Sequence, residues 1–279
     1  MNKRPSSSNF YGQSKKFRVS TSSAQASAIE YGDTHKLDVS LVSNTPSDIE
    51  AALVYLKSKF PTQKFEGRLP PVLLVHQLYS IIKCKTSVDR EINCLQAKGA
   101  VRIFKLGGEE AALVIISSDD LVNHIIQHCP RKPVINRFVK ELIPKVQDVS
   151  IDKALLQGDL GFTQQEISDL VSAGLLTLRS AASFWFSFPN AGEFMRTYLK
   201  GRKSVLRTIR KCKFSEILQF ELEQRKLEKS AKLGMLYHIH DIIGAELVKW
   251  YVLWGGLKIG NSGCHLLSIA DPLITCIPC

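Results

Sequence analysis

The sequence has no long hydrophobic run: none of its apolar stretches approaches the roughly 18 residues needed to span a bilayer. The polar start Met1-Asn-Lys-Arg-Pro gives no reason to expect a signal peptide. The seven cysteines are odd in number and irregularly spaced, unlike those of a disulfide framework. We therefore expect a soluble, intracellular protein with free thiols and no membrane partner.

Catalytic motifs are lacking as well. A protein kinase needs a glycine-rich phosphate loop, a strand lysine, a catalytic Asp and a magnesium-binding Asp, and none of these motifs occurs here. The stretch Gly158-Asp-Leu-Gly-Phe162 falls in a predicted loop between helices. Serine/threonine kinase activity is thus a minor alternative, and we predict no enzyme, no catalytic residue and no cofactor.

Metal-ligand patterns are sparse. His238, His240 and Asp241 are close in sequence, but no Cys-x-x-Cys pair with usable spacing lies nearby, so cap and core roles are favoured. The Cys276-x-x-Cys279 pair stands alone at the end of the chain and is interpreted as incidental. We predict no metal site.

Positive charge is abundant, with a net charge of +11 and a pI near 9.3. Residues 193–232 contain twelve Lys/Arg against five Asp/Glu, a net of +7, and residues 1–46 contain six against three, a net of +3. Clustered cations bind phosphates by releasing condensed counterions. The distribution therefore favours a polyanionic partner.

Residues 1–45 are rich in Ser, Thr, Asn and Lys without apolar periodicity, which predicts a disordered basic tail. Two basic clusters within it, separated by ten residues, are typical of a bipartite nuclear import signal: Lys3, Arg4, Lys15, Lys16 and Arg18. A merely solubilising tail is the alternative.

After Pro46 the pattern predicts three helices and a hairpin. Ile49, Leu53, Leu56 and Phe60 have helical spacing behind a cap at Ser47 or Asp48, and apolar segments follow at 72–82 and 87–98. Two β-rich runs, 101–106 and 112–116, are joined by a glycine turn. Three helices followed by a hairpin is the winged-helix order.

The same order returns along the chain. Helices near 134–142, 151–156 and 163–172 precede strands at 175–179 and 183–188, and a third set would have helices at 191–213, 214–226 and 240–248 with a hairpin after Lys249. The predicted fold is mainly α with small β-hairpins (α+β), in three tandem winged-helix units. Their boundaries are 46–118, 119–189 and 190–255, and a divergent tail follows at 256–279. The sequence does not predict a complete wing for the third unit.

The most informative charge pattern is a helical stripe in the third unit. Arg196, Lys200, Lys203, Arg207 and Arg210 are spaced to lie on one face, and no carboxylate occurs between Glu193 and Glu216. The opposite stripe of Met195, Tyr198, Leu199, Val205, Leu206 and Ile209 would face the core, while Gly201 could split the helix. We predict DNA-binding residues at the stripe and its flanks: Arg196, Lys200, Arg202, Lys203, Arg207, Arg210, Lys211, Lys213, Arg225 and Lys226.

The third helix of each unit, which reads DNA in ordinary winged helices, has few cations. The exposed positions would be Asp89, Arg90, Glu91 and Asn93 in the first; Gln164, Gln165, Glu166, Ser168 and Asp169 in the second; and Asp241 and Glu246 in the third. Carboxylates repel phosphates, so we expect backbone-directed binding with little base readout. Phe184, Trp185 and Phe186 are interpreted as core, not as a base-stacking platform.

Several segments resemble a known family. Leu175-Leu-Thr-Leu-Arg179, Phe184-Trp-Phe186, Lys200-Gly-Arg202, Arg210-Lys-Cys-Lys213 and Tyr237-His-Ile-His-Asp-Ile-Ile-Gly-Ala245 are similar to the winged-helix family historically named serine/threonine-protein kinase 19. The resemblance covers about residues 46–248 and departs afterwards. It implies three winged helices, nuclear and chromatin association, DNA binding and a role in transcription-coupled nucleotide excision repair.

Two functional classes follow. The first is a non-catalytic nuclear protein that binds double-stranded DNA largely without sequence preference and meets nuclear repair and transcription proteins. The second is a winged-helix interaction scaffold without direct DNA binding. Either would be a monomer or weak dimer in the nucleus, and only the first predicts a steep salt dependence on duplex DNA.

Overall fold

The part of the chain that the structure describes contains three small antiparallel sheets, each with three strands, in the orders β1-β3-β2, β4-β6-β5 and β7-β9-β8. The computed structural model describes residues 47–107, 112–129, 133–228, 231–253 and 256–261. The predicted tail at 1–45 with its import signal, and residues 262–279 with Cys276 and Cys279, lie outside the described residues. The described residues between 47 and 261 belong to one compact unit.

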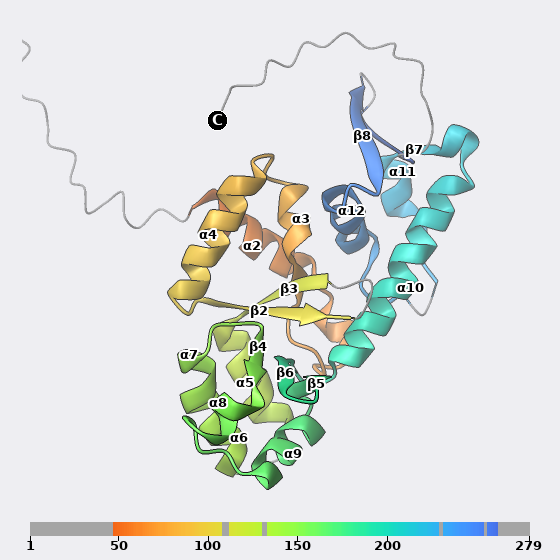
Figure 1. The fold of residues 1–279 in the computed structure, drawn as a ribbon. Helices are drawn as coiled ribbons and strands as arrows, with labels where there is room; N and C mark the ends of the chain where they lie inside the picture. Colours follow the sequence, from red (N-terminus) through yellow and green to blue (C-terminus); the bar gives the residue numbers. More distant parts are fainter. Residues whose placement is uncertain (1–46, 108–111, 130–132, 229–230, 254–255, 262–279) are drawn as a thin grey trace, which may run out of the picture. The chain divides into compact units, whose positions relative to one another are not determined.

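The first sheet and the helices around it lie between residues 48 and 117 (Figure 1). Its elements are α2 (Asp48–Lys59), a 3-10 turn (Thr62–Phe65), β1 (Leu73–Leu74), α3 (Val75–Tyr79), α4 (Lys85–Ala97), β2 (Val101–Leu106) and β3 (Ala112–Ser117). A capping box begins α2: Ser47 Oγ accepts from the Glu50 amide at 3.1 Å, and Glu50 accepts from the Ser47 amide. The Ser47 cap therefore forms as predicted.

The second sheet follows the same order after an additional helix. Its elements are α5 (Ser118–His128), α6 (Pro133–Arg137), a π-helical segment (Phe138–Leu142), α7 (Ile143–Lys145), β4 (Ser150–Asp152), α8 (Lys153–Gln157), α9 (Gln164–Ser172), β5 (Leu176–Ser180) and β6 (Ser183–Phe186). Helix α5 was not predicted, although its apolar positions Leu121 and Ile125 are four residues apart and buried.

The third sheet closes beyond the expected boundary at residue 255. Its elements are α10 (Ala191–Arg210), a 3-10 turn (Lys213–Ser215), β7 (Glu216–Leu218), α11 (Gln219–Gln224), α12 (Met235–Gly244), β8 (Val248–Leu253) and β9 (Gly256–Asn261). Strand β9 pairs with both β7 and β8. The start of the predicted divergent tail thus completes the third wing.

Two helix predictions in this part are wrong. In place of a helix over 214–226, Phe214 adopts a left-handed φ of 59° and the chain then enters β7, so that only Gln219–Gln224 is helical. The helix predicted at 240–248 is α12, which starts five residues earlier and ends at Gly244. In both places tertiary pairing with β9 and packing of α12 outweigh local helical periodicity.

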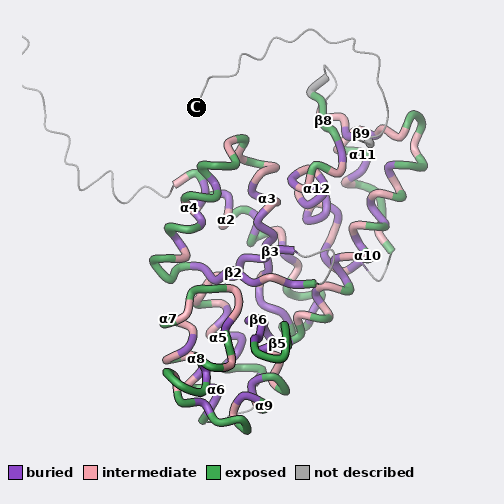
Figure 2. The backbone as a smooth tube through the Cα atoms, in the orientation of Figure 1, coloured by how far each residue is buried: buried purple, intermediate pink, exposed green. Residues whose placement is uncertain are grey.

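The hydrophobic core is shared between the three sheets. One cluster runs from Phe60 near the start through Phe104 and Phe186 to Tyr198 and Tyr237. A second lies beneath α2 and α4, and a third joins α10, α12 and β9. Helix α12 is largely buried (Figure 2). The first cluster therefore joins segments of all three sheets, while the second belongs mainly to the first sheet and the third to the third sheet.

Candidate nucleic-acid interface

Helix α10 carries the basic residues that the sequence placed on one helix face. All five are exposed: Arg196, Lys200, Lys203, Arg207 and Arg210. The inner side carries buried residues, among them Phe194, Tyr198, Val205 and Ile209. Of the predicted inward stripe, Met195, Leu199 and Leu206 are half-buried. We call the five exposed cations the α10 basic face; over fourteen residues the helix rises about 20 Å.

Gly201 does not split this helix, which runs unbroken from Ala191 to Arg210. The glycine is buried where α10 crosses α12, and a Cβ atom there would lie 1.9 Å from Nε2 of His238. The absence of a side chain therefore permits the close approach of the two helices.

Arg202 differs from its neighbours on α10. Its guanidinium is turned toward α12, with Nε donating to Oδ2 of Asp241 at 2.9 Å, and its side chain is only 18% exposed. Tyr198 donates to the same carboxylate at 3.1 Å, and His76 on α3 contacts it at 2.6 Å. Arg202 thus forms part of a buried ion cluster, and we leave it out of the DNA site that the sequence assigned to it.

The buried cluster has a strong effect on Asp241. Burial by itself would raise the pKa of this carboxyl, but the hydrogen bonds from Arg202 and the contacts with His76 and nearby His238 outweigh burial and hold the pKa well below its usual range. Asp241 is therefore ionised and not exposed, in contrast to the prediction that it lies on the open face of a recognition helix.

The remaining predicted cations lie beyond α10 and are exposed: Lys211, Lys213, Arg225 and Lys226. Arg225 and Lys226 line a hollow that also includes Lys64 and Lys232. Arg207 forms an ion pair with Glu228 at 3.1 Å, in which both side chains are more than half exposed. Such a pair contributes about 0–1 kcal/mol, so a phosphate can displace it.

Helix α12 occupies the position that enters the DNA groove in ordinary winged helices, yet it is packed inside the molecule. It lies beside α3 (Figure 1), where Gln77 Nε2 donates to the Tyr237 carbonyl at 2.9 Å and Tyr237 donates to the Val72 carbonyl at 3.0 Å. A Cβ atom at Gly244 would lie 1.8 Å from the His76 carbonyl oxygen. No groove of DNA can reach this face of the helix in the folded chain.

The corresponding helices α4 and α9 are accessible. Asp89, Arg90 and Asn93 are exposed on α4, with Glu91 half-buried. On α9 the exposed residues are Gln164, Gln165 and Ser168, while Glu166 and Asp169 are half-buried. Neither helix offers the density of cations found on α10.

The sequence missed one cationic cluster. Trp185 is half-buried, not core, although Phe184 and Phe186 on either side are buried as predicted. Lys105 Nζ lies 5.2 Å and Arg179 Cζ lies 4.4 Å from the indole ring. The alternation of a strand could have revealed this, because a residue between two inward positions points outward.

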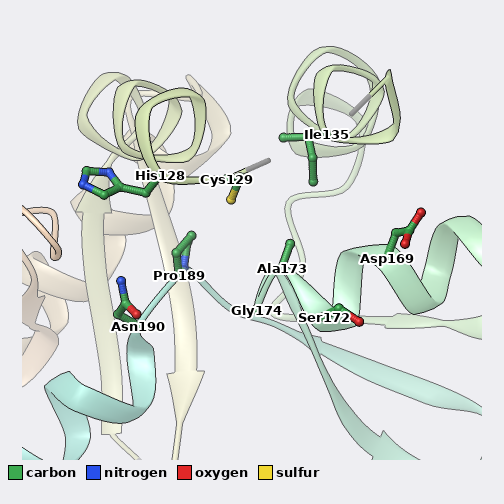
Figure 3. Close-up of a pocket in the computed structure, with 9 residues that line it drawn as sticks. All are labelled: His128, Cys129, Ile135, Asp169, Ser172, Ala173, Gly174, Pro189 and Asn190. Carbon is green, nitrogen blue, oxygen red and sulfur yellow. The ribbon is translucent and has the colours of Figure 1, made fainter. Parts of the chain in front are cut away.

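A pocket between α5, α9 and the start of α10 brings together groups that could suggest chemistry (Figure 3). Its lining includes His128, Cys129 and Asp169, but His128 and Asp169 lie on opposite sides of it. Burial raises the pKa of the Cys129 thiol, which favours the unreactive protonated form. Figure 3 shows the His128 ring directed away from the Cys129 sulfur, so the labelled lining residues do not form a paired nucleophile and base.

The candidate metal residues are engaged in structure. His240 Nδ1 lies 2.8 Å from Ser80 Oγ, and His238 is fully buried against Gly201. Among the residues that the structure describes, no group of three or more His, Cys, Asp or Glu is placed to hold a metal ion. Within these same ranges, no helix is both long and apolar enough to cross a membrane.

Each small three-stranded sheet combines a short strand with a hairpin that follows two helices, which defines a winged-helix protein of mixed α/β structure. Residues 45–252 match the model of a family described as inactive serine-threonine protein kinase 19, and the chain belongs to this family. The description confirms the predicted family and the prediction that the chain is not an enzyme.

The chain is similar to proteins named winged helix repair factor 1. It is 37% identical to the human protein over 206 residues, covering 73% of this chain and 81% of that protein. The protein of Xenopus laevis is 37% identical over 204 residues (72% and 78%), and that of Dictyostelium discoideum is 26% identical over 259 residues (78% and 65%).

Proposed function

We propose that this chain is a nuclear, non-catalytic DNA-binding protein that contacts the phosphates of duplex DNA through the α10 basic face. The observation that carries the proposal is the exposure of all five cations along one side of α10, opposite a buried side. Among the described residues, Glu228 is the one carboxylate that forms an ion pair with them. Like charges held in a row repel one another and are stabilised when a polyanion binds.

The fold proposal is a set of three tandem winged-helix units, beginning near residues 46, 119 and 190 and ending near 261. The threefold recurrence of strand, two helices and hairpin supports it. Since α12 is sequestered and α4 and α9 have few cations, DNA would be held from outside the usual recognition helices. Binding would follow the backbone over about 20 Å, comparable to roughly six base pairs, with little base readout.

The names of the relatives support a repair role. Together with the resemblance, the name winged helix repair factor 1 favours transcription-coupled nucleotide excision repair in chromatin, in contact with nuclear repair and transcription proteins. The exposed faces of α4 and α9, which are neutral or acidic, are the proposed contacts for such proteins. We propose a monomer or weak dimer.

The test is duplex-DNA binding over a range of salt concentrations for the wild type and for Lys203→Glu/Arg207→Glu/Arg210→Glu. Each phosphate contact contributes about 0.9 to the log-log slope, so the slope of the variant should fall by roughly 2.7, with most of the affinity lost. Circular dichroism checks that the variant is folded.

A matched control changes the net charge equally on exposed lysines elsewhere: Lys98→Glu/Lys140→Glu/Lys145→Glu. This control should retain more affinity and a steeper slope than the α10 variant. Equal losses in both variants would mean that only net charge matters. Equal binding by wild type and α10 variant would remove the α10 basic face from the DNA site, and no duplex binding by the wild type would favour the interaction scaffold without direct DNA binding.

A further inference from the structure

The outward face of the second sheet displays a compact set of polar and cationic side chains. Across the sheet, Ser150 on β4 pairs with Trp185 on β6, and Trp185 pairs with Thr177 on β5. Arg179 follows Thr177 by two residues and is exposed, as is Thr177. Side chains on one face repeat every second residue, which brings Ser150, Trp185 and Thr177 together. Arg179 lies at an irregularity in the register of β5 and β6, and its contacts with Trp185 and Ser150 place it beside them.

Two cations share the Trp185 ring. Lys105 comes from β2 of the first sheet and Arg179 from β5 of the second, at 5.2 Å and 4.4 Å from the ring centre. Arg179 also donates through Nη1 to Ser150 Oγ at 3.0 Å. Within the described ranges, neither cation forms an ion pair with a carboxylate.

This arrangement has the features of an anion site. The indole and the Ser150 hydroxyl fix the directions of two like charges, so little side-chain freedom is lost when a ligand binds. Arg offers a planar fork of donors that matches a phosphate, and Lys adds a second charge. The hydroxyl of Thr177 is a further donor for a phosphate oxygen.

We propose that Lys105, Arg179 and Trp185 form a second nucleic-acid contact, which binds backbone phosphates of the same duplex that lies on the α10 basic face. The inference rests on the proposed DNA binding. Trp185 precedes the start of α10 at Ala191 by six residues, a span of at most about 20 Å even when extended. Arg196, the first cation of the α10 basic face, lies about 7.5 Å further along the helix. A duplex of roughly ten base pairs is therefore long enough to span the distance between the two sites.

An acidic protein segment is the competing occupant. The preference for DNA rests on the pairing of this cluster with a second, larger cationic surface a short distance along the chain, since a duplex presents phosphates continuously over that length. An acidic peptide would have to supply carboxylates at both places.

The test uses Trp185 as its own reporter. Trp250→Phe/Trp254→Phe leaves Trp185 as the sole tryptophan of the full chain, which has three. Titration with short duplex DNA should change its emission over the same DNA concentrations at which binding is seen by anisotropy of a labelled duplex. Inorganic phosphate at the same phosphate concentration should leave the emission unchanged.

The companion variant is Lys105→Gln/Arg179→Gln, with Lys140→Gln/Lys145→Gln as a control of equal charge. The first should lower the salt slope by roughly 1.8 and the second should not.

If duplex binds but Trp185 emission and the slope of the first variant stay unchanged, the second contact is refuted while the α10 proposal stands. If the wild type binds no duplex at all, both proposals fail, and if free phosphate reproduces the full response, the site is a small-anion site and not a nucleic-acid contact.

Discussion

At the scale of single residues, the crossing of α10 and α12 depends on the missing side chain of Gly201. We expect Gly201→Ala to destabilise the fold by about 1–3 kcal/mol, because the methyl group would overlap the imidazole of His238. Gly192 on the same helix is the control: it is exposed with nothing within 4 Å of its Cβ position, so Gly192→Ala should be neutral or stabilising by up to ~1 kcal/mol. Urea unfolding measures both, and equal effects would contradict the close approach at Gly201.

Asp241 makes the stability depend on pH in a defined direction. Its pKa is lower in the folded protein than in the unfolded chain, so its contribution is complete above the ordinary aspartate range near 4 and is lost as the pH falls through and below that range. Asp241→Asn should cost about 3–5 kcal/mol at neutral pH, since it leaves Arg202 without its buried partner.

The measurement for Asp241 is denaturant unfolding at several pH values between neutral and acid. The difference between wild type and Asp241→Asn should shrink as the pH falls below about 4. A difference that is constant with pH would show that the pKa of Asp241 is the same in the folded and the unfolded protein.

At the scale of elements, α10 contains two kinds of cation that the sequence does not distinguish. Arg202→Gln should weaken the fold by several kcal/mol with little change in the salt slope of DNA binding, because Arg202 pairs with Asp241. Lys203→Gln should change stability by less than about 0.5 kcal/mol and lower the slope by about 0.9. A result in which Arg202→Gln lowers the slope as Lys203→Gln does would return Arg202 to the DNA site.

The α10 basic face could be predicted because it is a local pattern: charges three and four residues apart share a helix face whatever the helix packs on. Arg202 could not be excluded in the same way, because its partner is 39 residues away in sequence. The burial of Asp241 and the outward position of Trp185 likewise depend on contacts between distant segments. Local periodicity predicted the helices near α2, α4 and α9, and it failed at β7 and α11, where pairing with β9 decides the conformation.

At the scale of the whole molecule, the basic tail is expected to direct the protein to the nucleus. Replacing Lys3, Arg4, Lys15, Lys16 and Arg18 by Ala should move the chain to the cytoplasm when it is fused to a reporter too large to diffuse through nuclear pores. Lys36→Ala in the same tail is the control and should have no effect. Fluorescence microscopy reads both, and a reporter that stays nuclear in the first variant would mean that the tail is only solubilising.

The order of predicted elements showed the repeat of three sheets, but it did not show the apolar cluster that joins them. Arg102 illustrates the difference: it belongs to β2, is 4% exposed, and donates to the carbonyls of Ile143 and Asp148 in the second segment. Burial lowers its pKa to about 10 despite the nearby Asp148, so it remains charged at neutral pH. A cation in a β-strand gives no indication in the sequence that it joins two units.

The position of α12 also limits how this protein can be altered. In many winged-helix proteins, exchanging the exposed side chains of the third helix gives a new target sequence, because that helix reads bases and contributes little to the interior. Here α12 is held between α3 and α10, with Tyr237, His238 and Ile242 all buried. We expect that grafting a foreign recognition helix into this position would unfold the third unit and would not give a new DNA target. Substitutions along α12 are therefore limited by the volume and shape of the side chains, as in a protein interior.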